Sequence, residues 1–114
     1  MIEIVAKAPD RLAMRITDDL KMENAREFFD LFREHYTDSQ VQVLIDFGKI
    51  RFVDSSGIGI LLRCAEEVKK RGGSFFICGL NKSMQSVFRL AGLHKIFELL
   101  EQEQANMRFP ELQS

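Results

Sequence analysis

Two short strand-like segments lie near the start of the chain, residues 2–5 and residues 11–16, and apolar and polar residues alternate in the second. A period of two residues is typical of a β-strand that buries one face. In the second segment, one face carries Leu12, Met14 and Ile16. Residues 7–10 separate the two segments and contain a proline and an aspartate, which favour a turn. We therefore predict an N-terminal β-hairpin.

Two longer segments have apolar residues at helical spacing instead. Residues 22–36 form an apolar stripe of Met22, Ala25, Phe28, Phe29, Phe32 and Tyr36. Residues 56–71 form a second stripe of Ile58, Leu61, Leu62, Ala65 and Val68. Two glycines follow this second segment, as they commonly do at the end of a helix. We predict two amphipathic helices, and we assign the aromatic stripe to a core because a helix that packs on a sheet needs one.

The rest of the chain predicts further strands and a third helix. Residues 41–47 and 74–78 are apolar on both faces, as central strands are, and Asp46 marks the end of the first. Asn81 is a plausible cap for a helix whose expected inner face holds Met84, Val87, Phe88 and Ala91. We predict a last short strand within residues 94–100. Residues 101–114 are mostly polar, so we expect a short, loosely attached helix and tail there.

The order of these elements predicts an α/β fold. After the hairpin, strands alternate with helices, and such crossover connections join parallel strands. The chain has 114 residues, of which 46% are hydrophobic, so one domain can bury an ordinary core. We expect a small mixed β-sheet covered by α-helices, in a single domain of residues 1–114 whose core spans about residues 2–100.

Charge and hydropathy exclude several classes of partner. The formal net charge is -1, so the chain lacks the concentrated basic charge that nucleic acids or anionic membranes attract. No apolar run reaches the roughly 18 to 20 residues that span a bilayer, and the N-terminus lacks the basic region of a signal peptide. We predict a cytoplasmic protein without direct membrane insertion. Cys64 and Cys78 lie among apolar residues, so we expect buried free thiols rather than a disulfide.

The most distinctive segment, residues 52–59, leads into the second predicted helix with an Asp-Ser-Ser-Gly sequence. Asp54, Ser55 or Ser56 can cap that helix by accepting hydrogen bonds from its unpaired amides. A helix N-terminus also stabilises an attached anion. Local physics alone leaves two interpretations open, an ordinary capped turn and a functional site.

Enzymatic motifs are incomplete. Ser55 and Gly57 match half of a nucleophile elbow, but Val53 stands where its first glycine is needed, and no acid and histidine complete a triad. No phosphate-binding glycine motif occurs. His35 and His94 lie far apart without the spacing of metal ligands. We therefore expect no enzyme activity, no metal site and no cofactor.

Four segments together resemble the STAS domain of bacterial anti-sigma factor antagonists: residues 43–47, 52–59, 71–73 and 87–93. The resemblance runs from about residue 2 to about residue 100. It implies that Ser55 is phosphorylated, with Ser56 as the second choice. It also implies a partner switch: the unmodified protein binds an anti-sigma factor that is a serine kinase of the histidine-kinase-like ATPase type. That kinase phosphorylates the serine and dissociates, and a metal-dependent serine phosphatase resets the switch, so ATP and the divalent metal belong to the partners.

The expected partner surface surrounds this serine. We expect Ile60 to be exposed, because it lies nearly opposite the buried stripe of its helix, and we expect it to dock the partner together with the backbone of Gly57 and Gly59. The full set of expected contacts is Asp54, Ser56, Gly57, Ile58, Gly59, Ile60, Asp19 and Lys21. Many antagonists have an acidic residue where this chain has Lys21. This reversal leaves open a switch whose output is not a sigma factor.

A second function class also fits the resemblance. The chain could be a constitutive soluble STAS subunit that serves as a scaffold in a membrane lipid or anion transport complex. In that case Ser55 only caps its helix.

Overall fold

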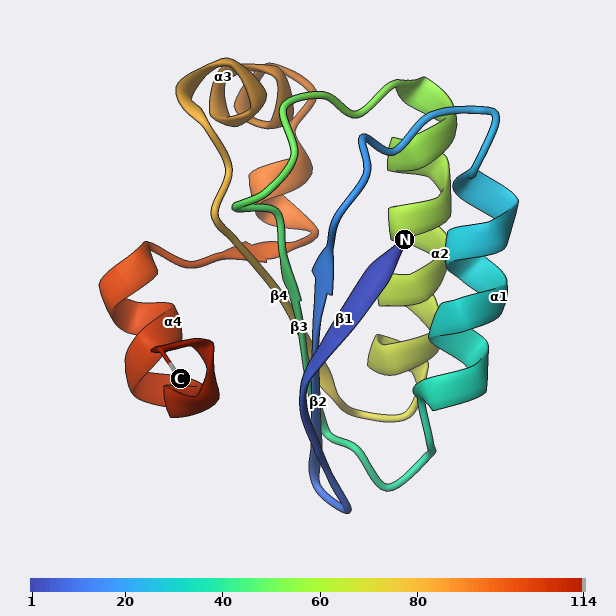
Figure 1. Ribbon diagram of the computed structural model, residues 1–114, viewed down its shortest axis with the longest axis vertical. Coiled ribbons are helices and arrows are strands. Elements are labelled where there is room, and N and C mark those ends of the chain that lie inside the picture. Colours follow the sequence, from blue (N-terminus) through green and yellow to red (C-terminus); the bar gives the residue numbers. More distant parts are fainter. Residues whose placement is uncertain (114) are drawn as a thin grey trace.

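The computed structural model describes residues 1–113 and contains one five-stranded sheet in the order β1-β2-β3-β4-β5 (Figure 1). β1 (Ile2–Ala8) and β2 (Arg11–Ile16) form the predicted antiparallel hairpin. β3 (Gln42–Asp46), β4 (Ser74–Cys78) and β5 (Glu98–Leu99) then add in parallel. The predicted mixed sheet is therefore confirmed, with its parallel strands joined by helical crossovers.

Helices cover the sheet on both faces. α1 (Ala25–His35) and α2 (Ser55–Lys70) lie side by side on one face, and α4 (Gln102–Arg108) lies on the other (Figure 1). α3 (Lys82–Leu90) lies beyond the carboxyl ends of the strands (Figure 1). A short 3-10 turn, Leu93–Lys95, links it to β5. The loops that precede α2 and α3 thus gather at one end of the sheet, where parallel α/β folds place their sites.

The sheet buries apolar side chains on both faces, as the strand pattern predicts. The larger core lies under α1 and α2 and contains Leu12, Met14, Ile16, Phe28, Phe32, Val43, Ile45, Leu61, Val68, Phe75 and Ile77. The smaller core lies under α4 and contains Ala6, Ala13, Leu44, Phe76, Cys78, Ala105 and Phe109. The larger core therefore holds α2 in a fixed position against the sheet.

The first helix and the strand after it are shorter than predicted. The helix starts at Ala25, and Met22, which we placed in the buried stripe, is 72% exposed. The chain turns just before the helix because Asn24 accepts a hydrogen bond from the backbone N–H of Lys21. The strand predicted for residues 41–47 covers only Gln42–Asp46, although its end at Asp46 is as predicted.

The inner face of α3 is narrower than predicted. Met84 and Phe88 are buried as expected, but Val87 is 47% exposed and Ala91 is also exposed. α3 sits over the end of the sheet rather than along its face, so only the side chains one turn apart on its inner side reach the core. The strand predicted within residues 94–100 is reduced to Glu98–Leu99.

The expectation of a loosely attached C-terminal segment is wrong for the residues that the structure describes. Ala105 and Phe109 are both fully buried, one helical turn apart, against the second face of the sheet. The ring of Phe109 packs edge-on against Phe76, with 6.4 Å between centroids. The Arg11 guanidinium covers Phe109 at 5.5 Å. This segment is therefore part of the core.

Cys64 and Cys78 are buried free cysteines, as predicted. Burial raises the pKa of both thiols, and that of Cys78 rises to about 12. Both therefore stay protonated near neutral pH and act as small apolar side chains. Across residues 1–113, none of the helices combines the length and the apolar character needed to cross a membrane.

Candidate functional site

Asp54 organises the start of α2. Its side chain is the N-cap, and Oδ1 accepts a hydrogen bond from the backbone N–H of Gly57 at 3.0 Å. Its second oxygen, Oδ2, accepts from the backbone N–H of Met22 at 3.0 Å. The carboxylate therefore caps the helix and also ties it to the loop after β2.

That loop is held beside the site by further backbone pairing. Leu20 pairs with Val53 in a parallel bridge, with hydrogen bonds from Leu20 N to Phe52 O and from Asp54 N to Leu20 O. Asp19 Oδ1 accepts from the backbone N–H groups of Arg51 and Phe52, at 2.9 and 3.3 Å. Asp19, which we expected at the partner surface, thus has a structural role that its position in the sequence did not reveal.

Ser55 is the first residue of α2 and is exposed, whereas Ser56 is half-buried. Within the described residues the Ser55 hydroxyl has no hydrogen-bond partner, and the residue is open to solvent. An anion on this hydroxyl would lie at the positive end of a 16-residue helix. The predicted set of residues from Asp54 to Ile60 therefore occupies the first two turns of α2, and Leu20 brings Lys21 next to them.

Hydrogen bonds and charge keep Asp54 ionised. The hydrogen bond from Gly57 is the main cause that lowers the pKa of Asp54, and bonds from Met22 and Ser56 and the charge of Lys21 add to it. A phosphate on Ser55 would therefore stand beside an existing carboxylate. Lys21 is the positive charge that acts on the same carboxylate.

The lowered pKa of Asp54 predicts a pH-dependent stability. Its stabilising effect is present above the unfolded pKa of about 3.9 and is lost as pH falls through the lower folded value. Asp54→Ala should therefore unfold at a lower urea concentration than wild type at pH 7, and the difference should shrink below pH ~4. Glu66→Ala, which removes an exposed carboxylate of the same helix, is the control. A difference that stays constant down to pH ~3 would show that the charge of Asp54 does not contribute.

Two glycines of α2 have different environments. A Cβ on Gly57 would lie 2.8 Å from the carbonyl oxygen of Leu20 and 2.8 Å from Cγ1 of Val53, so the fold requires glycine there. A Cβ on Gly59 would meet no atom within 4 Å. Glycine inside a helix lowers the stability of that helix, and no close contact within residues 1–113 requires glycine at position 59. A glycine at a partly exposed helix position allows another molecule to approach the helix backbone closely.

Alanine at the two positions should have opposite effects on stability. Gly57→Ala should lower the free energy of unfolding by about 1 to 3 kcal/mol, because its Cβ overlaps backbone. Gly59→Ala should raise it by about 0.5 to 1 kcal/mol through helix propensity. Urea denaturation of both variants measures the two changes. Equal effects of the two substitutions would contradict the packing that we describe.

We predicted that Ile60 is exposed, but it is half-buried against the larger core. The spacing of apolar residues in α2 indicates only the side that packs on the sheet, whereas α1 covers a second flank of α2. Arg63, one turn after Ile60, lies over the Phe29 ring of α1 at 4.3 Å. Ile58 is also half-buried rather than fully buried.

The exposed apolar side chains beside Ser55 are ones that the sequence did not indicate. Met22 is 72% exposed and Phe52 is 50% exposed. The backbone N–H of Met22 donates a hydrogen bond to the Asp54 carboxylate, and Phe52 lies two residues before Asp54 in the sequence. Both are single apolar residues in loops, so no periodic pattern marks them. We call Met22, Phe52 and Ser55 the serine face.

The fold and this site define a helix-covered α/β domain with an exposed serine at a helix N-terminus. A family model described as the STAS domain matches residues 3–106. The chain therefore belongs to the STAS domain family, and the resemblance inferred from its sequence is confirmed.

Curated relatives include anti-sigma factor antagonists. The chain is 26% identical to the anti-sigma F factor antagonist of Paenibacillus polymyxa over 61 residues. This match covers 54% of this chain and 52% of that protein. It is 20% identical to the anti-sigma-B factor antagonist of Listeria monocytogenes over 98 residues. This match covers 86% of each chain. The match thus spans only about half the length of the Paenibacillus relative, and 55% of another relative, from Bordetella bronchiseptica.

Solved structures share the fold at low sequence identity. An anti-sigma factor antagonist from Mycobacterium paratuberculosis has a TM-score of 0.77 at 20% identity, over 96% of this chain and 95% of that one. The Bacillus cell fate determinant SpoIIAA in its phosphorylated form has a TM-score of 0.72 at 18% identity, over 95% and 98%. The murine anion transporter Slc26a9 has a TM-score of 0.65 at 16% identity, over 74% of this chain and 14% of the transporter.

Proposed function

We propose that this protein is a phosphorylatable binding module of the anti-sigma factor antagonist type, with no catalysis or cofactor of its own. In the unmodified state its serine face binds an anti-sigma factor that is also a serine kinase of the histidine-kinase-like ATPase type. Phosphorylation of Ser55 ends that binding. The observation that carries the proposal is the exposed, unbonded Ser55 hydroxyl at the N-terminus of α2, beside the exposed Met22 and Phe52.

The site tolerates a phosphate within the folded domain. The group carries about -1.5 to -2 charges at neutral pH, and the N-terminus of α2 stabilises negative charge. Ser55 is exposed, so phosphorylation displaces no core side chain. The fold is therefore expected to survive the modification.

The same phosphate is unfavourable in an interface. A partner that packs on Met22 and Phe52 would have to desolvate a dianion beside the ionised Asp54. Burial of an unpaired charge costs several kcal/mol, so affinity falls by orders of magnitude. Charge and desolvation thus provide the switch without a change of fold.

The relatives support this assignment by class. Two are anti-sigma factor antagonists, and one structural neighbour exists in a phosphorylated form. We propose that a metal-dependent serine phosphatase removes the phosphate, and that ATP and the divalent metal belong to the kinase and phosphatase. Lys21 reverses the charge of an acidic position common in antagonists, so the effector that is released could be other than a sigma factor.

Intact-mass spectrometry of the protein from its native cells tests the proposal. A mass increase of one phosphoryl group that phosphatase removes and that maps to Ser55 supports it. The Ser55→Ala variant should lack this species. If the protein carries no phosphate in resting or stressed cells, and the cognate kinase with ATP adds none in vitro, the proposal fails.

A second candidate is favoured by the structural likeness to part of an anion transporter. In this function the domain is a constitutive scaffold subunit of a membrane lipid or anion transport complex, and Ser55 only begins the helix. Ser55→Asp separates the two functions, because it should leave the scaffold assembled but abolish binding to a kinase.

A further inference from the structure

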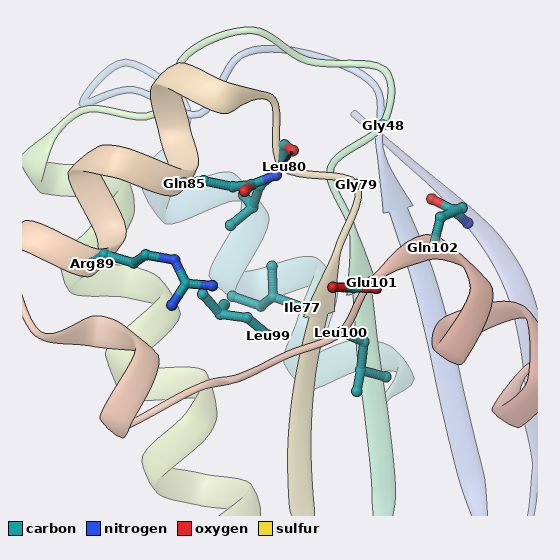
Figure 2. A pocket seen from close by; sticks show the side chains of 10 residues that line it. All are labelled: Gly48, Ile77, Gly79, Leu80, Gln85, Arg89, Leu99, Leu100, Glu101 and Gln102. Atoms are coloured by element: carbon teal, nitrogen blue, oxygen red, sulfur yellow. Dashed lines mark hydrogen bonds between the residues drawn. The ribbon is translucent and has the colours of Figure 1, made fainter.

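A cavity of about 510 Å³ lies at the carboxyl ends of the parallel strands, between α3 and the start of α4 (Figure 2). It shares no lining residue with the serine face. Small molecules commonly bind open α/β sheets at this edge, and the volume lies within the usual range of about 300 to 1,000 Å³ for their sites. The cavity is therefore a candidate for a ligand that the proposed switch does not involve.

Two glycines bring the loops after β3 and β4 together at one wall of the cavity. Gly48 follows β3, and Gly79 follows β4 with a φ of +78°, a conformation that favours glycine. A Cβ on Gly79 would lie 2.6 Å from the backbone nitrogen of Gly48. The two loops can meet this closely only without side chains, and both glycines line the cavity. Backbone contact between the two loops therefore forms this wall of the cavity.

The floor of the cavity is apolar. Ile77 of β4 lies at its base, and the half-buried Leu80 and Leu99 line it from the loop before α3 and from β5 (Figure 2). A hydrocarbon chain placed on these side chains would leave water, which is favourable in proportion to the area buried.

Two opposite charges enter the cavity from opposite walls. Figure 2 shows Arg89 reaching in from α3 and Glu101 from the start of α4, with Ile77 and Leu99 between them. Gln85, one turn before Arg89, is fixed at the rim by a hydrogen bond from its Nε2 to the carbonyl of Leu80 at 2.9 Å. Within residues 1–113, Arg89 has no hydrogen bond or ion pair. Its guanidinium is thus available to a ligand.

We propose that this cavity binds a small zwitterionic molecule, an ω-amino acid with a carboxylate at one end and an ammonium group at the other. Arg89 binds the carboxylate, for which its planar guanidinium offers paired donors. Glu101 accepts the ammonium group, and Leu80 and Leu99 contact the chain between them. A molecule with only one of the two charges leaves either Glu101 or Arg89 opposite an unmatched group, so it binds more weakly.

Methyl-resolved NMR of the full chain tests this proposal directly. The probes are a series of ω-amino acids from β-alanine to ε-aminocaproate, together with caproate and hexylamine, which each carry one of the two charges. At least one ω-amino acid should shift the methyl signals of Leu80 and Leu99, with a Kd about tenfold lower than that of caproate or hexylamine.

Variants of the two charged residues separate their roles. In Arg89→Gln, the ω-amino acid should bind no more tightly than hexylamine, which carries only the ammonium group. In Glu101→Gln, it should bind no more tightly than caproate, which carries only the carboxylate. Arg26→Gln is the matched control, because Arg26 pairs with Asp30 on the outer side of α1. It should bind as wild type does. The proposal is overturned if no probe shifts these methyl signals at millimolar concentration, or if Arg89→Gln and Arg26→Gln bind the probes equally.

Discussion

Replacement of Ser55 by aspartate is expected to weaken binding of the proposed kinase partner by about 100-fold or more, while the domain stays folded. The new carboxylate lies beside Asp54, whose own charge is stabilised by the hydrogen bonds from Gly57 and Met22. A partner seated on the serine face would have to bury both charges. The fold should be unaffected because the residue is exposed at a helix N-terminus.

Two variants complete this experiment. Ser55→Ala should bind the kinase at least as well as wild type does, because it can accept no phosphate. Ser83→Asp places the same charge in the first turn of α3, at another exposed serine, and should leave affinity within about twofold of wild type. Affinities come from isothermal titration, and folding from circular dichroism. If Ser55→Asp binds as tightly as Ser83→Asp, the serine face is not the interface.

The largest expected effect on stability comes from Phe109→Ala, in the segment that the sequence had suggested to be loose. Phe109 is fully buried between the ring of Phe76 and the guanidinium of Arg11. Removal of a buried phenyl ring leaves a cavity and costs about 3 to 5 kcal/mol. That is a large fraction of the total stability of a domain of this size.

Met107→Ala is the control for that substitution. Met107 lies in α4, which ends just before Phe109, but is 78% exposed, so its loss should change the free energy of unfolding by less than about 0.5 kcal/mol. Urea denaturation followed by far-UV circular dichroism measures both variants. Comparable small effects would mean that α4 does not belong to the core of the domain.

Periodicity predicted the order and type of most elements because each has one dominant burial pattern. The stripe that contains Phe28 and Phe32 repeats at helical spacing, and β3 and β4 are apolar on both faces. These patterns follow from the layered architecture itself. The fold class was therefore predictable from these patterns, whereas the family was predictable from the four segments that resemble the STAS domain.

Packing between helices was not predictable in the same way. Ile60 looks exposed on α2 alone, but α1 covers that flank, as the contact of Arg63 with Phe29 shows. α4 has few apolar residues, yet Ala105 and Phe109 lie one turn apart and are enough to anchor it. In both cases burial depends on an element that is distant in the sequence or weak in its pattern.

For the site, sequence motifs identified the helix start but not its surroundings. The Asp-Ser-Ser-Gly sequence predicted the cap, and the structure assigns that role to Asp54. The bonds of Asp19 to residues 51 and 52 join parts of the chain more than thirty residues apart, which no local pattern indicates. Met22 reaches the site through the pairing of Leu20 with Val53 and through its own hydrogen bond to Asp54, contacts that join distant parts of the chain.

The proposed switch is tested most directly by the affinity of the proposed kinase partner for the protein before and after phosphorylation of Ser55. The kinase, saturated with ADP, is titrated with the unmodified protein and then with protein phosphorylated stoichiometrically at Ser55. We predict a fall in affinity of about 100-fold or more, with unchanged circular dichroism of the two forms. Equal affinity of the two forms would contradict a switch at Ser55.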